Sequence, residues 1–117
     1  VLSLTACSER FDQAYDTRAV AERDGAFARG WLPDWIPASA TDIREAHDID
    51  TNASAFSFSA PHGYQLPATA NCTPVSGAAE PTVALPDFPS RTARQSNVVK
   101  CGPFFVLVRG TRVFAWR

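Results

Sequence analysis

The C-terminal residues 98–117 constrain the fold most, because they predict a strand that must be covered on both faces. The run Phe104 to Val108 is apolar at every position, so it has no polar face to turn toward water. After Arg109-Gly110-Thr111, a second branched and aromatic run ends at Trp116, which predicts a β-hairpin with a glycine in its turn. The sequence therefore predicts a sheet with residues 104–108 in its interior.

Residues 9–23 are predicted to form a helix. Phe11, Ala14, Tyr15 and Ala19 recur at helical spacing and make one apolar stripe. Ser8 can cap the start of this helix, and Asp24-Gly25 can end it.

Two further strands are predicted at residues 42–49 and 55–59. The second alternates small polar residues with Phe56 and Phe58, as a half-buried strand does. For the first, a short helix started by Ser39 or Thr41 is the alternative. The predicted fold class is α+β: one domain, residues 8–117, in which the N-terminal helix packs on a small antiparallel sheet of about four strands.

Prolines define two irregular segments. Pro33 and Pro37 exclude a regular helix or central strand around Trp31 and Trp35. These tryptophans either pack on the core in a rigid bend or form an exposed aromatic binding surface. The long Pro-rich loop, Pro61 to Asn97, holds six of the nine prolines and is predicted to be irregular, with a short helix near 91–95.

The stretch HDIDTNA, residues 47–53, carries the main candidate site: His47, Asp48, Asp50 and Asn52. Between two strands, Asp and Asn are typical turn residues, because they bond their own backbone and tolerate left-handed angles. The alternating oxygen-bearing side chains also resemble half of a calcium loop. That loop needs glycine at its sixth position and glutamate at its twelfth, where this chain has Ala53 and Ser59.

Catalytic alternatives rest on the same stretch. His47, Asp48 or Asp50, and His62 are residue types that bind zinc or copper, and they could also serve a small hydrolase. The sequence has no nucleophile elbow, no spaced histidine pair and no phosphate-binding glycine loop. We therefore assign no catalytic residue, metal or cofactor, and an enzyme centred on His47, Asp48 and Asp50 is the second hypothesis.

Charge is distributed unevenly along the chain. Residues 1–52 hold ten acidic and five basic residues, and residues 53–117 hold two acidic and six basic residues. The two halves could attract each other within one fold, or the basic half could meet an anionic partner. The net charge of −1 argues against a nucleic-acid partner.

The N-terminus resembles the end of a bacterial lipoprotein signal peptide. Leu4-Thr5-Ala6-Cys7 is similar to a lipobox, which implies that residues 1–7 are a remnant of the signal peptide and that Cys7 carries the lipid. Ser8, rather than aspartate, follows Cys7. By that resemblance, the protein is expected to be lipid-anchored in the bacterial cell envelope, in the outer membrane facing the periplasm.

The cysteine count agrees with this expectation. The chain has three cysteines, and a lipidated Cys7 would leave Cys72 and Cys101 as a pair. In an oxidising compartment such a pair is normally joined as a disulfide. The alternative is a cytosolic protein with free thiols.

The segments GWLP, IPASA and HDIDTN together resemble small uncharacterised bacterial lipoproteins with a lipobox and a GWLP…SA…HDxDTN segment. The resemblance covers residues 4–60 best. It implies an envelope location and an α+β fold, and it assigns no activity. We therefore expect a non-catalytic binding or structural module that meets an envelope protein or an anionic ligand.

Overall fold

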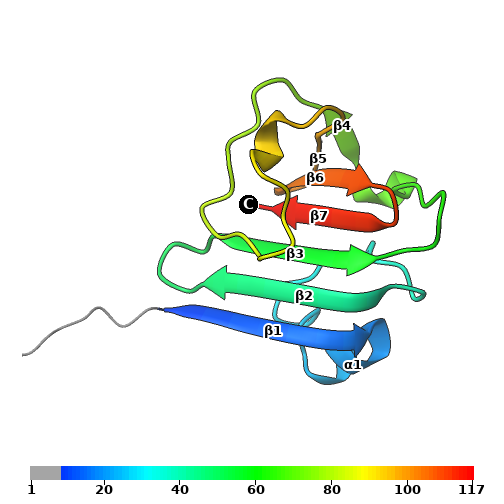
Figure 1. Ribbon diagram of the computed structural model, residues 1–117. Helices are drawn as coiled ribbons and strands as arrows, with labels where there is room; N and C mark the ends of the chain where they lie inside the picture. Colours follow the sequence, from blue (N-terminus) through cyan, green and yellow to red (C-terminus); the bar gives the residue numbers. More distant parts are fainter. Residues whose placement is uncertain (1–8) are drawn as a thin grey trace, which may run out of the picture.

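A single seven-stranded antiparallel sheet dominates the computed structural model, which describes residues 9–117 (Figure 1). Its strands are β1 (Arg10–Thr17), β2 (Thr41–Asp48), β3 (Ser54–Ser59), β4 (Cys72–Pro74), β5 (Val99–Cys101), β6 (Phe104–Arg109) and β7 (Arg112–Trp116). The helices are α1 (Arg18–Arg23) and the 3-10 helices η1 (Ala68–Ala70) and η2 (Thr92–Arg94). The spatial order is β1-β2-β3-β7-β6-β5-β4. The predicted α+β fold with about four strands is therefore wrong, because the chain is β-rich and has one short α-helix among its described residues.

The predicted N-terminal helix is wrong over most of its length. Residues 10–17 form β1, and only Arg18–Arg23 are helical. β1 pairs along its length with β2, so its backbone groups find partners in the sheet and not in a helix. The cap of α1 is Thr17 and not Ser8, since the Thr17 Oγ1 accepts a hydrogen bond from the Val20 N–H at 3.3 Å.

Both predicted hairpins are present. β2 and β3 are joined by residues 49–53, and the strand at 41–48 replaces the alternative helix. β3 is buried on both faces, not half-buried, because it lies between β2 and β7. β6 lies between β7 and β5, which confirms the interior position predicted for residues 104–108.

Irregular segments cover both faces of the sheet (Figure 1). On the front face of that view, part of the Pro-rich loop packs Val83 and Leu85 against β6 and β7. On the rear face, α1 and the segment after it supply Ala21, Leu32 and other core residues. Each sheet face therefore has its own apolar cluster.

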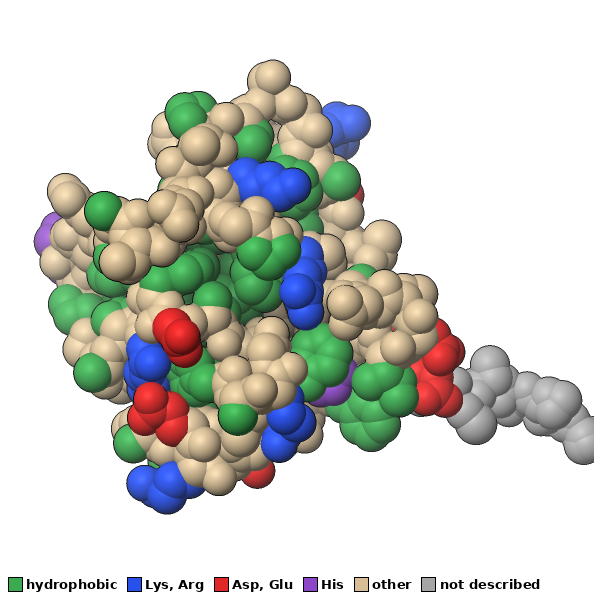
Figure 2. All heavy atoms as spheres, turned by 180° about the vertical axis from the view of Figure 1, so that it is seen from behind, with side chains coloured by type: hydrophobic (Ala, Val, Ile, Leu, Met, Phe, Trp, Pro, Cys, Tyr) green, Lys and Arg blue, Asp and Glu red, His purple; other side chains and the backbone are tan. Residues whose placement is uncertain are grey.

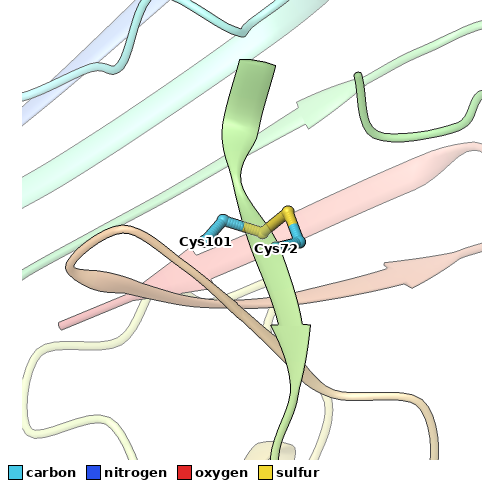
Figure 3. The surroundings of a disulfide bond; sticks show 2 residues. All are labelled: Cys72 and Cys101. Carbon is cyan, nitrogen blue, oxygen red and sulfur yellow. A yellow bond between two sulfur atoms is a disulfide. The ribbon is translucent and has the colours of Figure 1, made fainter. Parts of the chain in front are cut away.

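A disulfide joins the short strands at one edge of the sheet (Figure 3). Cys72 and Cys101 are register partners in β4 and β5, their Cα atoms are 4.0 Å apart, and their sulfur atoms are 2.04 Å apart. The predicted Cys72–Cys101 bond is thus confirmed. It fixes β4, which lies within the Pro-rich loop, to β5, which follows that loop.

Arg112 joins the Pro-rich loop to the sheet from the front face. Its Nε lies 2.9 Å from Asp87 Oδ2, and its other nitrogens donate to the hydroxyls of Ser57 and Ser59. Asp87 also accepts a hydrogen bond from Ser57 Oγ at 2.8 Å. This network ties residue 87 of the loop to β3 and β7.

The predicted signal remnant, the lipobox and Cys7 lie outside the described residues. Within residues 9–117, no helix combines the length and hydrophobicity needed to cross a membrane.

Candidate functional site

A shallow groove opens on the rear face of the sheet, beside the start of β1. Six residues line it: Phe11, Gln13, Arg29, Trp31, His47 and Ile49. Its volume is about 390 Å³. Figure 2 shows this face, where hydrophobic, basic and histidine side chains gather near the point at which the described chain begins. We call this feature the β1–β2 groove.

A stack of rings forms the wall of the β1–β2 groove. The His47 ring lies parallel to the Trp31 indole, with centroids 3.7 Å apart and an interplanar angle of 7°. Phe11, the register partner of His47, lies on the other side with a centroid distance of 5.6 Å. The Arg117 guanidinium continues the stack beyond Trp31, 6.0 Å from its ring. The imidazole is therefore packed between two aromatic rings.

Glu45 lies under this stack and is almost completely buried, at 1% exposure. Two residues apart on β2, Glu45 and His47 point to the same face of the sheet. Glu45 Oε2 and His47 Nδ1 are 2.7 Å apart, so the two side chains form a hydrogen-bonded pair.

The environment of this pair favours its uncharged form. The pKa of Glu45 is raised from 4.5 to about 8, chiefly by burial and also by nearby Asp12, against the opposing effect of Arg29 and Arg117. Burial also lowers the pKa of His47, and the positive charge of Arg29 lowers it too. A protonated Glu45 can donate to Nδ1, which leaves the His47 proton on Nε2.

The exposed part of the β1–β2 groove is apolar with a cationic border. Phe11 is 47% exposed and Ile49 is 52% exposed, although both are large hydrophobic residues. Arg29 lies beside them with its side chain 54% exposed, and it forms an ion pair with the equally exposed Asp24 at 3.5 Å. None of the described residues that line the groove carries a hydroxyl, thiol or carboxylate that could act as a nucleophile or general base beside His47.

The rest of the HDIDTN segment lies in the β2–β3 turn. Asp48 Oδ1 accepts the backbone N–H groups of Asp50 and Thr51, at 2.8 and 3.2 Å. Asn52 has a left-handed φ of 63°, a conformation that asparagine tolerates. Asp50 is exposed. Because neighbouring residues of a strand point to opposite faces, His47 and Asp48 do not share a site.

The remaining candidates are also separated. His47 pairs with Ser54 at the start of β3, whereas His62 follows the other end of that strand. The two histidines therefore do not meet. In residues 9–117, no group of three or more His, Cys, Asp or Glu side chains is placed to hold a metal ion. Trp31 forms part of the β1–β2 groove, whereas Trp35 packs on Phe56 and Phe58 in the core.

Sequence reasoning missed Glu45 and Arg29. Glu45 and His47 are two residues apart on a predicted strand, which places their side chains on one face of the sheet. This spacing is the sequence signal that could have predicted the pair. Their burial depends on Trp31, which lies on a separate irregular segment and whose position no local pattern predicts. Arg29 gives no sequence signal of its own.

Comparison with known proteins gives one family similarity. Residues 9–59 match the family described as the YbbD head domain. No curated protein and no solved structure matches the chain. The matched region spans β1, α1, β2 and β3, and so contains all six residues of the β1–β2 groove. That similarity points to an envelope-associated protein.

Proposed function

We propose that this protein is a lipid-anchored, non-catalytic binding module of the bacterial cell envelope, held in the outer membrane through Cys7 and facing the periplasm. The β1–β2 groove is its contact surface. The similarity of residues 9–59 to the YbbD head domain supports the envelope assignment.

The pairing of Cys72 with Cys101 carries the proposal. A disulfide is expected in an oxidising compartment, and this one accounts for two of the three cysteines. Cys7, the third, stands within the lipobox-like Leu4-Thr5-Ala6-Cys7. Acylation of Cys7 would give membrane attachment, since each buried CH₂ contributes about 0.8 kcal/mol and several chains together hold a protein stably.

The partner is an envelope protein that places an apolar side chain in the β1–β2 groove and a carboxylate beside it. Phe11 and Ile49 offer the exposed apolar contact, and Arg29 offers the matching positive charge. The hydrogen-bonded and stacked His47 has a structural task here, because it holds Phe11 and Trp31 in place.

Intact mass tests the anchor. The full-length gene product, made in a Gram-negative host, should begin at Cys7 and carry a lipid increment. The same sample should lack two hydrogen masses that reductant restores, because Cys72 and Cys101 are joined. An unmodified chain with three free thiols would refute the envelope assignment.

Photo-crosslinking tests the contact surface. A photoreactive residue at Ile49 should give one discrete adduct with an envelope protein in intact cells, and Arg29→Glu should abolish it. The same residue placed at Val20, an exposed hydrophobic position on α1 outside the groove, is the matched control. Equal labelling from both positions would show that the β1–β2 groove is not a contact surface.

A further inference from the structure

His47 presents one unbonded nitrogen to the β1–β2 groove. Its ring lines the groove, and its side chain is 11% exposed. Nδ1 is bonded to Glu45, whereas Nε2 has no hydrogen-bond partner within residues 9–117. The described side-chain nitrogen and oxygen atoms that are buried without a partner are Tyr64 Oη and Asp87 Oδ1. Because His47 Nε2 is not one of them, it is open to the groove.

The imidazole is held in one orientation. Trp31 lies parallel to it with a centroid distance of 3.7 Å, and Phe11 lies on its other side at 5.6 Å. The bond of 2.7 Å between Glu45 Oε2 and Nδ1 fixes the rotation of the ring within its plane. A group that is already oriented before binding loses little conformational entropy when a ligand arrives. Nε2 is therefore a pre-organised contact atom.

The Glu45–His47 pair controls whether Nε2 carries a proton. While the pair holds two exchangeable protons, one is on Nε2 and the other lies between Glu45 Oε2 and His47 Nδ1, on either atom. Nε2 is then a donor whether the pair is uncharged or is an ion pair. When one proton leaves to water, the remaining proton stays between Oε2 and Nδ1, because an ionised carboxylate only accepts. Nε2 is left with a lone pair and becomes an acceptor.

The surroundings of Glu45 place the loss of this proton near pH 8. The pKa of Glu45 is raised to about 8, chiefly by burial and also by Asp12 on β1, against the opposing charges of Arg29 and Arg117. Tyr15, also on β1, has a pKa raised chiefly by burial, so its phenol stays neutral in this range. The groove therefore offers an N–H donor at neutral pH and loses this donor above about pH 8.

The surroundings of Nε2 favour a carboxylate as its acceptor. Phe11 and Ile49 give the groove an exposed apolar surface. Arg29 and Arg117 both act on the buried pair as nearby positive charges. An N–H donor requires an acceptor, and the two positive charges favour an anionic one. Arg29 keeps its ion pair with Asp24, so the bond to the ligand comes from Nε2 and not from the guanidinium.

We propose that His47 Nε2–H donates a hydrogen bond to the carboxylate of the partner, and that Glu45 is the positioning residue that keeps the proton on this nitrogen. Binding in the β1–β2 groove then requires the protonated pair. This inference rests on the proposed function, because the partner is the one that places an apolar side chain in the groove and a carboxylate beside it.

Binding of a small probe tests the donor. N-acetyl-leucine carries an apolar side chain next to a carboxylate, and N-acetyl-leucinamide is the matched control without the charge. In the full chain with Cys7→Ser, nitrogen-15 NMR of the imidazole should show the carboxylate probe bound about tenfold more tightly than the amide. The shifted signal should be that of Nε2. Equal binding of the two probes, or no effect of either on Nε2, would overturn the inference.

The pH profile tests the part played by Glu45. Affinity for N-acetyl-leucine should fall about tenfold or more between about pH 7 and about pH 9.5, as Nε2 loses its proton. Glu45→Gln carries an amide that does not titrate, so its affinity should be the same at both pH values. A merely structural role of Glu45 would change the affinity without removing its pH dependence. A Glu45→Gln chain that loses affinity as steeply as the unmodified chain would contradict the positioning role.

Two replacements of His47 test the nitrogen atom itself. The amide of His47→Gln reaches the position of Nε2, whereas the shorter side chain of His47→Asn reaches only that of Nδ1. Both variants remove the ring from the stack, so the loss of packing is common to them. His47→Gln should bind N-acetyl-leucine about tenfold more tightly than His47→Asn. Tighter binding by His47→Asn would refute the donor, and the Glu45→Gln profile decides where neither variant folds.

Failure of this inference is distinguishable from failure of the proposed function. An adduct from the photoreactive residue at Ile49, without probe binding at Nε2, would refute the donor and leave the contact surface standing. Probe binding at Nε2, without an Ile49 adduct in intact cells, would refute the envelope partner and leave the donor in place.

Discussion

Glu45 should make the stability of the protein fall as the pH rises. Its pKa is raised from 4.5 to about 8 in the folded protein, chiefly by burial. Between these two values the folded state binds more protons than the unfolded state, so the free energy of unfolding decreases with increasing pH. At about 1.4 kcal/mol per pKa unit, the total loss is of the order of a few kcal/mol.

Glu45→Gln should remove this pH dependence. The variant keeps a neutral side chain at every pH, so its advantage over the unmodified protein should grow between pH 4.5 and about 8 and then level off. Urea unfolding across that range measures the difference. The lowered pKa of His47 has the opposite effect, because it makes the free energy of unfolding decrease as the pH falls below 6.5. Both proteins retain His47, so most of this effect cancels when the variant is compared with the unmodified protein. Parallel stability curves would mean that Glu45 is ionised in the folded state.

The β2–β3 turn should depend on Asp48 and not on Asp50. Asp48 Oδ1 accepts two backbone N–H groups, at 2.8 and 3.2 Å, whereas the exposed Asp50 side chain makes no such bond within residues 9–117. Asp48→Ala should cost about 1 kcal/mol in unfolding free energy. Asp50→Ala is the matched control and should stay within about 0.5 kcal/mol of the unmodified protein. Equal losses would show that the turn does not rely on the Asp48 bonds.

At the scale of single elements, the disulfide should protect β4 more than the rest of the sheet. The bond closes a loop with a sequence separation of 29, which corresponds to roughly 3.5 kcal/mol on the chain-entropy estimate. Replacing Cys72 and Cys101 together by alanine should lower stability by about that amount. Hydrogen exchange should accelerate first in β4 and β5. Uniform acceleration through β2, β3 and β7 would contradict this local role.

The Pro-rich loop should loosen when Arg112 is removed. Arg112 Nε lies 2.9 Å from Asp87, and both side chains are mostly covered, at 16% and 23% exposure. Arg112→Ala would leave the Asp87 carboxylate without its counter-charge, at a cost of about 2–4 kcal/mol. Limited proteolysis should then cut within residues 75–97. Arg109→Ala, at the exposed neighbouring position of the same hairpin, is the control and should not change the cleavage rate.

β1 shows where local pattern fails to predict an element. Phe11, Ala14 and Tyr15 fit a helical stripe, but Phe11, Gln13 and Tyr15 also fit an alternation. Short segments satisfy both periods, and pairing with β2 decides between them. By contrast, residues 104–116 have no such ambiguity, because branched and aromatic side chains surround one turn glycine.

At the scale of the whole molecule, ion pairs between the acidic first half and the basic second half contribute little to stability. The acidic first half and the basic second half do not lock together through many contacts: among residues 9–117, the Asp42–Arg112 pair, at 3.3 Å, is the one ion pair between the halves. Most others join residues close in sequence on the surface. High salt should therefore lower the unfolding free energy by less than about 1 kcal/mol. A larger loss in urea titrations would point to long-range attraction between the halves.

The parts of the site that sequence could predict are those that depend on neighbours along the chain. Asp48 and Asn52 follow turn chemistry, and Cys72 pairs with Cys101 by elimination once Cys7 is set aside. The β1–β2 groove could not be predicted, because it brings together β1, β2 and the irregular segment that carries Arg29 and Trp31. Its assembly requires the sheet order, which no local pattern contains.

The position of β7 has a consequence for how the protein is made. β7 follows the other strands in the chain, yet it lies between β3 and β6 at the centre of the sheet. Among residues 9–117, the strand groups β1–β3 and β4–β6 are joined in the sheet only through β7, which pairs with β3 on one side and β6 on the other. A chain that ends before residue 112 would therefore lack the strand that joins these two groups, and we expect it to be more sensitive to protease than the full chain.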